Sequence, residues 1–599
     1  MHRGATVDKH AHAVSFARAR TIARESRAAG KMTSKRSGLG ILRQKASVCV
    51  FYSLSVLLLL PLTVFADPGP ERASAVSNLQ SANLSPALLE ASGVIIGAIT
   101  IDIDDIFDLE NPEENKWIYE LANKAHPATR PQVVRQQLLF KSGDPFSARV
   151  MDESERLLRS NRYIQDAHIR PVRFEDGIVD IDVQTIDTWT FIPRISLSRQ
   201  GGENSTGFGL KELNLFGTGM QIGVTYKSDV DRDSTIIKFF DRNLGNSWYS
   251  LGAVYENNSD GYVRQLGIEK PFYSLVSTDA RGISLLDEDR IDALYDRGEI
   301  LAEYRHQTES YGFYSGWSKG LINGWTRRYT TGLAFEEHRF SPADGSTVPI
   351  SIVPADRKFD YPFIGIELMQ DRFEKTENLN QIHLTEDRFL GARVSARIGY
   401  ASKAVGSDRN AWLINAQAQT GFGSSSRSSL LLASSFTTRV ESDSLQNLTI
   451  QASANYHKRQ SGHRLFYASL SGVFGHNLDV DNQVLLGGDN GLRGYPLRYL
   501  SGDKSALLTI EQRFFSDWYP FRLIRVGGAV FFDAGRTWGE SPVGSDNPGL
   551  QTDVGFGLRL GNARSGLARM IHVDLAFPLG SDDNSIDNVQ LLIEAKSSF

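Results

Sequence analysis

From Trp189 onward, apolar and polar residues alternate in segments of about ten residues that are separated by Gly, Asn, Asp and Ser. A period of two places successive side chains on opposite faces of a β-strand. The pattern is clearest in the last four segments. In each of them, every second residue on one face is apolar: Val526, Val530 and Phe532 in the first; Val554, Phe556, Leu558 and Leu560 in the second; Ile571, Val573, Leu575, Phe577 and Leu579 in the third; and Val589, Leu591, Ile593, Ala595 and Phe599 in the last. These segments predict strands with one apolar and one polar face.

No segment of this region is long and apolar enough to form a membrane helix, and a soluble sandwich would have to pack one whole face on a second sheet. The pattern is therefore typical of a transmembrane β-barrel, predicted over residues 189–599. Its first strand lies near residues 190–199 and its last near 588–599. The region between 189 and 460 contains more candidate segments than a barrel of sixteen strands would allow, so for that number some would have to merge or belong to external hairpins, and an even number is required.

A smaller unit is predicted over residues 93–188. Ile99, Ile101 and Ile103 alternate with polar residues, as in a half-buried strand. A helix that opens at Thr129 and Pro131, a second helix after Ser147 and two further strands follow, which gives the order β-α-α-β-β. Such an α+β domain has a strand edge that can accept another strand, but a spacer that binds nothing has the same pattern.

The N-terminal segment resembles a secretory targeting sequence. Ala46 to Leu60 is an apolar run that is preceded by basic residues and followed by Val64-Phe65-Ala66. The run is shorter than the ~20 residues of a spanning helix, so we predict a signal peptide in residues 1–66, with Met32 as a second possible start. An anchoring helix and an organelle presequence are the alternatives. Residues 67–92, rich in Pro, Ser, Ala and Asn, are predicted to be a linker.

The mature chain is expected to begin at Asp67, because small residues end the segment that follows the apolar run. Amino-terminal sequencing of the protein from outer membranes checks this expectation directly. Recovery of residues 32–66 on the mature chain would contradict secretion through a cleaved signal.

Charge and cysteine content exclude some classes of partner and site. The chain has 65 basic and 70 acidic residues, and residues 1–66 hold eleven of the basic and two of the acidic ones, so the remainder carries a net charge of about −14. This balance argues against nucleic acid as a partner. The only cysteine, Cys49, lies in the predicted signal. The mature chain then has no thiol, disulfide or cysteine metal site, as in an exported protein of a bacterial envelope.

Several stretches resemble the BamA/TamA-like outer-membrane superfamily. Residues 93–188 resemble its periplasmic POTRA domain, and Leu492-Arg493-Gly494-Tyr495 resembles the tip of a loop that folds back into the barrel, although Leu492 stands where the family usually has Val. Phe531 to Gly535 resembles its Phe-x-Asp-x-Gly strand motif, and 212–219 its Asn-Leu-x-Gly-x-Gly hairpin. The resemblance implies a barrel of about sixteen strands, with Phe599 as the C-terminal recognition signal for insertion.

The polar candidates for a site lie in this loop and its facing strands. A loop that enters the barrel needs glycines for close approach to the wall, and it needs an anchor. Arg493 offers a planar fork of donors, and Asp533 has the parity that faces the interior and offers a bidentate acceptor. The predicted loop anchor comprises Arg493, Gly494, Tyr495, Asp533, Gly535, Glu511 and Arg559. Without the resemblance, Arg493 would be interpreted as a solvated loop residue.

Enzyme signatures are weak in this chain. Residues 316–320 fit the Gly-x-Ser-x-Gly expression of hydrolases, but they lie among alternating barrel residues with no helix behind them. His572 has interior parity, which invites comparison with a phospholipase, yet no serine is placed beside it. His457 and His463 lack metal-ligand spacing, and no phosphate loop is present. No enzyme activity, cofactor or metal is predicted.

Two classes of function remain. In the first, the POTRA domain receives unfolded outer-membrane or secreted client proteins, with periplasmic chaperones or accessory proteins as further partners, and the barrel inserts the clients into outer-membrane lipid or exports them. Insertion of barrel proteins competes here with two-partner secretion of one exported protein, whose transporters usually carry two POTRA domains. In the second class the chain is a passive outer-membrane pore or surface antigen. An organelle-type assembly protein with one POTRA domain is a further alternative.

Overall fold

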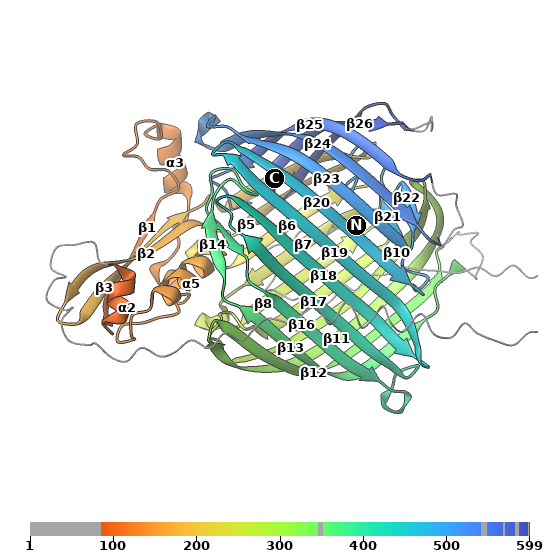
Figure 1. The fold of residues 1–599 in the computed structure, drawn as a ribbon, viewed down its shortest axis with the longest axis horizontal. Coiled ribbons are helices and arrows are strands. Elements are labelled where there is room, and N and C mark those ends of the chain that lie inside the picture. The colour runs from red at the N-terminus through yellow and green to blue at the C-terminus, as the bar shows by residue number, and fades with distance from the viewer. Residues whose placement is uncertain (1–84, 345–351, 541–547, 567–569, 581–585, 597) are drawn as a thin grey trace, which may run out of the picture.

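The computed structural model describes residues 85–599 except 345–351, 541–547, 567–569, 581–585 and 597. The predicted signal peptide and most of the predicted linker therefore lie outside the described residues. A small α+β domain lies at one end of a large barrel (Figure 1). No helix among the described residues has the length and apolar character that a membrane crossing requires.

The small domain has a three-stranded sheet in the order β1-β3-β2, with β1 parallel and β2 antiparallel to β3. Its elements are α2 (Pro86–Ala91), β1 (Ile95–Asp104), α3 (Trp117–Ala125), α4 (Pro131–Arg135), α5 (Ala148–Arg159), β2 (Ile164–Glu175) and β3 (Ile178–Asp187). The predicted helices are placed at α4 and α5, and α4 is shorter than the predicted helix. The helices α2 and α3 were not predicted. The assignment of this unit as a POTRA domain stays a prediction.

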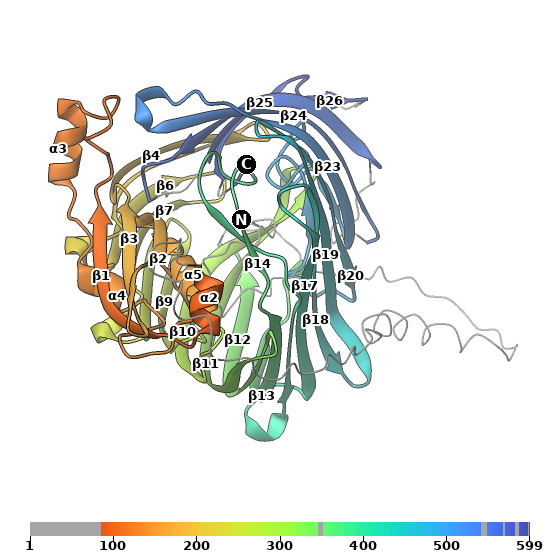
Figure 2. The same cartoon turned by 60° about the vertical axis from the view of Figure 1, so that its left-hand side comes forward.

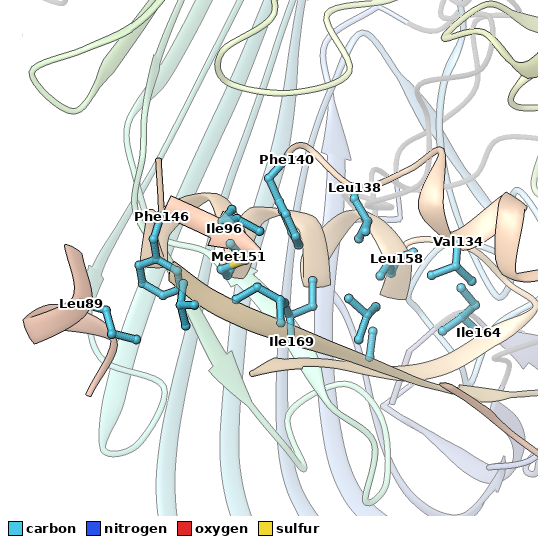
Figure 3. Packing of buried hydrophobic residues seen from close by; sticks show 14 of the residues in the cluster. Leu89, Ile96, Val134, Leu138, Phe140, Phe146, Met151, Leu158, Ile164 and Ile169 are labelled. Carbon is cyan, nitrogen blue, oxygen red and sulfur yellow. The ribbon is translucent and has the colours of Figure 1, made fainter. Parts of the chain in front are cut away.

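Burial of apolar side chains explains why these elements come together. Alternate residues of β3, among them Val179, Ile181 and Val183, are fully buried, as the period-two pattern of this strand requires. They pack with Leu158 of α5 and Val134 of α4 in one cluster (Figure 3). The cluster gives the domain a core of its own beside the barrel.

Twenty antiparallel strands close the barrel. They are β4 (Phe191–Gln200), β5 (Glu203–Glu212), β6 (Gln221–Ser228), β7 (Asp233–Asp241), β8 (Ser250–Asn258), β9 (Gly261–Lys270), β10 (Asp279–Asp296), β11 (Glu299–Ile322), β12 (Trp325–Pro342), β13 (Arg357–Gln370), β16 (Arg393–Ala401), β17 (Ala411–Gly423), β18 (Ser428–Glu441), β19 (Ser444–Ser461), β20 (Arg464–His476), β23 (Lys504–Phe515), β24 (Ile524–Trp538), β25 (Gln551–Asn562), β26 (Met570–Leu579) and β27 (Gln590–Lys596).

The predicted number of about sixteen strands is wrong. The strands between 189 and 460 pair with their neighbours in the wall, apart from a separate two-stranded sheet within residues 373–389. The short strands from β4 to β9, for example, form a continuous antiparallel series. The alternation pattern contained these strands, and the number taken from the family resemblance discarded them.

The wall has an apolar outside and a polar inside. Phe556 and Leu558 of β25 are exposed, whereas Asp553 and Arg559 of the same strand are fully buried. A closed barrel satisfies all backbone groups of its wall without water, and an apolar exterior suits contact with lipid. We treat the barrel as membrane-spanning, and we call the end that carries the small domain the periplasmic end, as the sequence analysis expects.

Candidate functional site

Two segments that are not part of the wall lie against its inner side. Residues 477–503 join β20 to β23 and contain the small hairpin of β21 (Val484–Leu486) and β22 (Leu500–Gly502). Leu486, Leu492, Tyr495, Tyr499 and Leu500 form a buried cluster in this loop. The loop therefore has a packed structure of its own inside the barrel, at the end away from the small domain.

Arg493 lies in a carboxylate cluster on the inner wall. Its Nε and Nη2 donate to the two carboxylate oxygens of Asp533, at 2.7 and 3.0 Å, and its Nη1 donates to Oε1 of Glu511 at 2.9 Å. Its guanidinium also stacks 3.4 Å from the ring centroid of Phe531. All three polar side chains are buried, so the pairs are shielded from water and fix the loop to β23 and β24.

The glycines of the predicted anchor lie where the loop approaches the wall closely. A Cβ on Gly494 would stand 2.7 Å from the Cβ of Asp553, and one on Gly535 would stand 2.7 Å from a methyl of Leu486. The N–H of Gly494 donates to Asp553 at 3.0 Å. Tyr495 donates its hydroxyl to the carbonyl of Thr552 at 2.9 Å. A side chain at either glycine would push the loop from the wall.

Arg559, predicted from its parity as a possible member of the network, is buried and is connected to Arg493 through a further carboxylate. It pairs with Asp574 on the neighbouring strand β26, and Asp574 lies 3.7 Å from Arg493. Glu511 takes Arg513 as its second cation, at 2.8 Å. Asp553 and Asp574 were not among the predicted site residues, although both alternate with apolar residues and so belong to the side of the strand that faces the interior.

The expected position of Phe599 on the lipid-facing side is wrong. Phe599 is buried in a cluster with Phe515, Met570 and the loop residues Leu379 and Ile382. Alternation assigns a face only while the strand continues, and β27 ends at Lys596. Beyond it the chain turns inward, where the carbonyl of Ser598 lies 2.9 Å from Nε2 of His572.

The segment between β13 and β16 forms the second internal structure, which we call the periplasmic hairpin (residues 371–392). It contains β14 (Phe373–Thr376) and β15 (Glu386–Phe389). Leu379 and Ile382 reach the inner side of β20, β23, β24 and β26. The hairpin thus extends from one part of the wall to another across the opening (Figure 2). The carbonyl of Asn380 accepts the N–H of Phe599 at 2.8 Å.

Ion pairs join the periplasmic hairpin to α5 of the small domain. Arg159 donates to both carboxylate oxygens of Asp387, at 2.8 and 2.9 Å. Lys375 pairs with Glu155 and Asp152. Burial opposes the charged form of Lys375, but the hydrogen bond that Lys375 donates to Glu155 and the nearby negative charges outweigh burial and raise its pKa. One segment therefore contacts the domain, the inner wall and Phe599.

The contact that closes the barrel, which we call the seam, is the weakest strand pairing in the wall. Ile593 of β27 and Arg199 of β4 are its only residues in register among those described. On either side of it, β26 and β27 pair from Met570 to Ala576, and β4 and β5 pair along all of β4. Gln200 and Glu594 add one side-chain hydrogen bond. Among the described residues, no other position of β4 has a register partner on β27, so β4 forms a strand edge at the seam.

A groove of about 810 Å³ lies between the small domain and the periplasmic rim. It is lined by Ile99 and Leu139 of the domain and by Trp248 and Tyr273 of the rim, whose rings stack 3.9 Å apart. β1 lies at the edge of its sheet, where Ile95 and Ile96 also pair with residues 143–146, and the residues that follow, 97–99, line the groove. Polar backbone groups and aromatic surface thus meet in one recess.

The two weak enzyme candidates are placed as follows. Ser318 lies within β11, where its hydroxyl donates to the carbonyl of Arg327 at 2.8 Å, and Phe272 lies against Gly316. The chain there is an antiparallel strand and not a strand-to-helix turn. His572 contacts the carbonyl of Ser598 and not a serine hydroxyl. In the described part of the chain, no group of three or more His, Cys, Asp or Glu is arranged to hold a metal ion.

No family model and no curated protein matches the sequence. Among solved structures, the chain is similar to BamA from Haemophilus ducreyi lacking POTRA domains 1–3, with 12% identity, 84% of this chain and 85% of that chain covered, and a TM-score of 0.36. CdiB from Escherichia coli is 12% identical, with 84% of this chain and 76% of that chain covered and a TM-score of 0.43. The FrpB iron transporter from Neisseria meningitidis is 8% identical, with 73% of this chain and 87% of that chain covered and a TM-score of 0.39. Likenesses at this level carry no argument about function.

Proposed function

We propose that this protein inserts or exports client proteins at the outer membrane, with the small domain receiving unfolded clients in the periplasm. The observation that carries the proposal is the seam, where a single register pair joins β27 to β4. Strand pairing in lipid is otherwise complete, because an unpaired backbone group costs several kcal/mol there. A wall with one incomplete pairing has a defined place at which it can open or accept a strand.

The edge of β4 at the seam has the properties of a template for a client strand. Ile195 and Leu197 on its outer side are 83% and 68% exposed, so the strand faces lipid, and neither residue has a register partner on the described part of β27. An incoming client strand satisfies these backbone groups by β-augmentation. Completed client strands then leave sideways into the membrane, where their apolar faces are stable.

The groove beside β1 is suited to the earlier step. An extended segment that lies along β1 gains main-chain hydrogen bonds, and its side chains contact the stacked rings of Trp248 and Tyr273. Such recognition depends on backbone and apolar surface more than on sequence, which suits unfolded clients of many kinds. The groove borders the rim and therefore delivers a bound segment next to the wall.

The two internal structures favour a gated device over a passive pore. The loop that carries Arg493 lies inside the barrel at the end away from the small domain, and the periplasmic hairpin lies across the opening at the end that carries the small domain. A pore needs an open passage, whereas an insertion factor needs a sealed interior. The hairpin contacts both α5 and Phe599, which follows the seam strand, so we propose that it transmits the occupancy of the domain to the seam.

Secretion of one exported partner is the second candidate function. It uses the same domain and barrel but requires the client to pass through the interior, with the loop and the periplasmic hairpin displaced. The buried carboxylate cluster around Arg493 and the extended hairpin make that displacement costly. Insertion through the seam leaves both in place and is the function that the geometry supports better.

Photo-crosslinking at the seam tests the proposal. With a benzophenone amino acid at Leu197, on the free edge strand, we expect adducts with outer-membrane proteins in growing cells. The matched control carries the same group at Leu558, which also lies on the outer face but on the fully paired β25. Adducts with one exported protein only would indicate the secretion transporter. Equal labelling by lipid alone at both positions would contradict a client-accepting seam.

A further inference from the structure

α3 lies apart from the core of the small domain. It belongs to a segment inserted between β1 and α4, and none of its residues is in the cluster that unites the sheet with α4 and α5. It forms a separate small cluster with Ile106 and Phe107. In both views α3 lies at the periphery of the molecule, near the periplasmic end of the strands at the C-terminal side of the barrel (Figures 1 and 2).

One side of α3 is held firmly against the barrel rim. Tyr119 stacks on Phe107 with centroids 4.5 Å apart, and its hydroxyl donates to the carbonyl of Phe521 at 2.9 Å. Arg564, which follows β25, bonds Glu114 at 2.7 Å and the carbonyl of Ile106 at 2.6 Å. These contacts fix the height and the rotation of the helix relative to the rim.

The other side of α3 is an unpartnered apolar face. Trp117, Ile118 and Leu121 are 75%, 53% and 56% exposed. At 100° per residue, these three side chains fall within one sector of the helix, and Tyr119 points roughly the opposite way. A helix that is fixed through Tyr119 therefore directs its apolar face away from the barrel contact.

The rim next to α3 extends this apolar surface. Trp518 and Phe521, in the turn between β23 and β24, are largely exposed. Leu523 and Ile524 follow, and Val530 continues the exposed face along β24. Through the hydrogen bond of Tyr119 to Phe521, α3 thus adjoins the lipid-facing side of the barrel, at residues of the kind that populate a membrane interface.

We infer that α3 and the adjoining turn 518–523 bind the periplasmic leaflet of the outer membrane, with phospholipid as the occupant. The position of α3 beside the exposed apolar rim of the lipid-facing wall selects lipid over a protein partner, and tryptophan and phenylalanine are suited to the headgroup boundary. A nine-residue helix binds a membrane weakly alone, but this one is tethered at the rim and so needs little added affinity. The inference rests on the barrel spanning a membrane and is independent of the proposed function.

Lipid contact at α3 has a structural consequence. The small domain is joined to β4 through residues 188–190 and to the rim through ion pairs. A lipid contact at α3 adds a further attachment on the side of β24 and β25, where Arg564 already binds Glu114. It holds the domain in one orientation under the barrel and keeps the groove beside β1 next to the rim.

Site-directed spin labelling tests the inference. A chain without residues 1–66 has no cysteine, so Leu121→Cys and Val172→Cys each give one label. Both residues are apolar and 56% exposed, but Val172 lies on β2, on the small domain away from the rim. In bilayers of phosphatidylethanolamine and phosphatidylglycerol, the label at 121 should be more accessible to oxygen than to a water-soluble nickel chelate. The label at 172 should show the reverse.

A second measurement guards against disturbance by the label. Lipids brominated near the headgroup end of the acyl chain should quench the wild-type tryptophan fluorescence more than that of Trp117→Phe, which keeps an apolar ring on the helix. Equal quenching of both proteins, or nickel accessibility at 121 equal to that at 172, would overturn the inference. Protection of position 121 only when periplasmic proteins are added would likewise overturn it and identify a protein as the occupant.

Discussion

A disulfide across the seam is expected to abolish activity in a reversible way. Arg199→Cys with Ile593→Cys places two thiols at the one register pair of β4 and β27. Residues directly opposite in antiparallel strands have Cα atoms about 4.5–5.5 Å apart, within the range that a disulfide bridges. If clients leave through the seam, oxidation should stop their insertion nearly completely and reduction should restore it. The measurement is the outer-membrane protein profile of cells that depend on the variant.

The control for this experiment locks a pair that is already fully bonded. Val573→Cys with Ile593→Cys cross-links β26 to β27 within seven paired positions, so it should leave activity unchanged in either redox state. A locked seam with normal activity, together with lost activity on deletion of residues 93–188, would support secretion through the interior. If neither the lock nor the deletion changes the outer-membrane or secreted proteins, the translocation proposals fail and a passive pore is the better explanation.

The seam lock depends on the seam being the weakest pairing, which is a property that the sequence does not carry. Alternation predicts strands and the face of each residue, since both follow from local backbone geometry. It does not tell how many residues of the first strand pair with the last, because the two are about 400 residues apart. The same limitation explains the wrong strand number, where a resemblance outweighed segments that alternate plainly.

The alternating pattern predicts the face of a residue best where the strand is regular. The contact of Arg493 with Asp533 and Glu511 follows the predicted faces, because β23 and β24 alternate without interruption there. The same logic failed for Phe599, which lies past the end of β27. It also gave no sign of the periplasmic hairpin, because Leu379 and Ile382 lie in a segment without period and find their neighbours only in three dimensions.

For α3, the sequence does not predict which residues are exposed. Trp117, Ile118 and Leu121 are apolar, and a sequence analysis that looks for core positions either buries such residues or passes over them. Only the packing of Tyr119 against the rim shows that they lie on the opposite, exposed side. An amphipathic pattern reports that a face is apolar and does not report what covers it.

Opening of the barrel interior is expected to need changes in both internal structures. Arg493→Ala removes the cation that neutralises Asp533 and Glu511, so these buried carboxylates repel each other and the loop loses its main attachment. The periplasmic hairpin still lies across the other opening in this variant. Single-channel conductance in planar bilayers should therefore rise modestly. Addition of Leu379→Ser and Ile382→Ser, which weakens the apolar contact of the hairpin with the inner wall, should raise it several-fold.

Two further variants separate the anchor from a general loss of packing. Arg493→Lys keeps one charge but loses the planar fork, so its conductance should fall between those of the wild type and the alanine variant. The exchange of Arg493→Asp with Asp533→Arg should recover only part of the seal, because Glu511 and Asp574 would then face a carboxylate at position 493. The prediction fails if Arg493→Ala alone opens the channel fully, since the hairpin would then be no barrier. It fails equally if the triple variant conducts like the wild type, since neither segment would then seal the barrel.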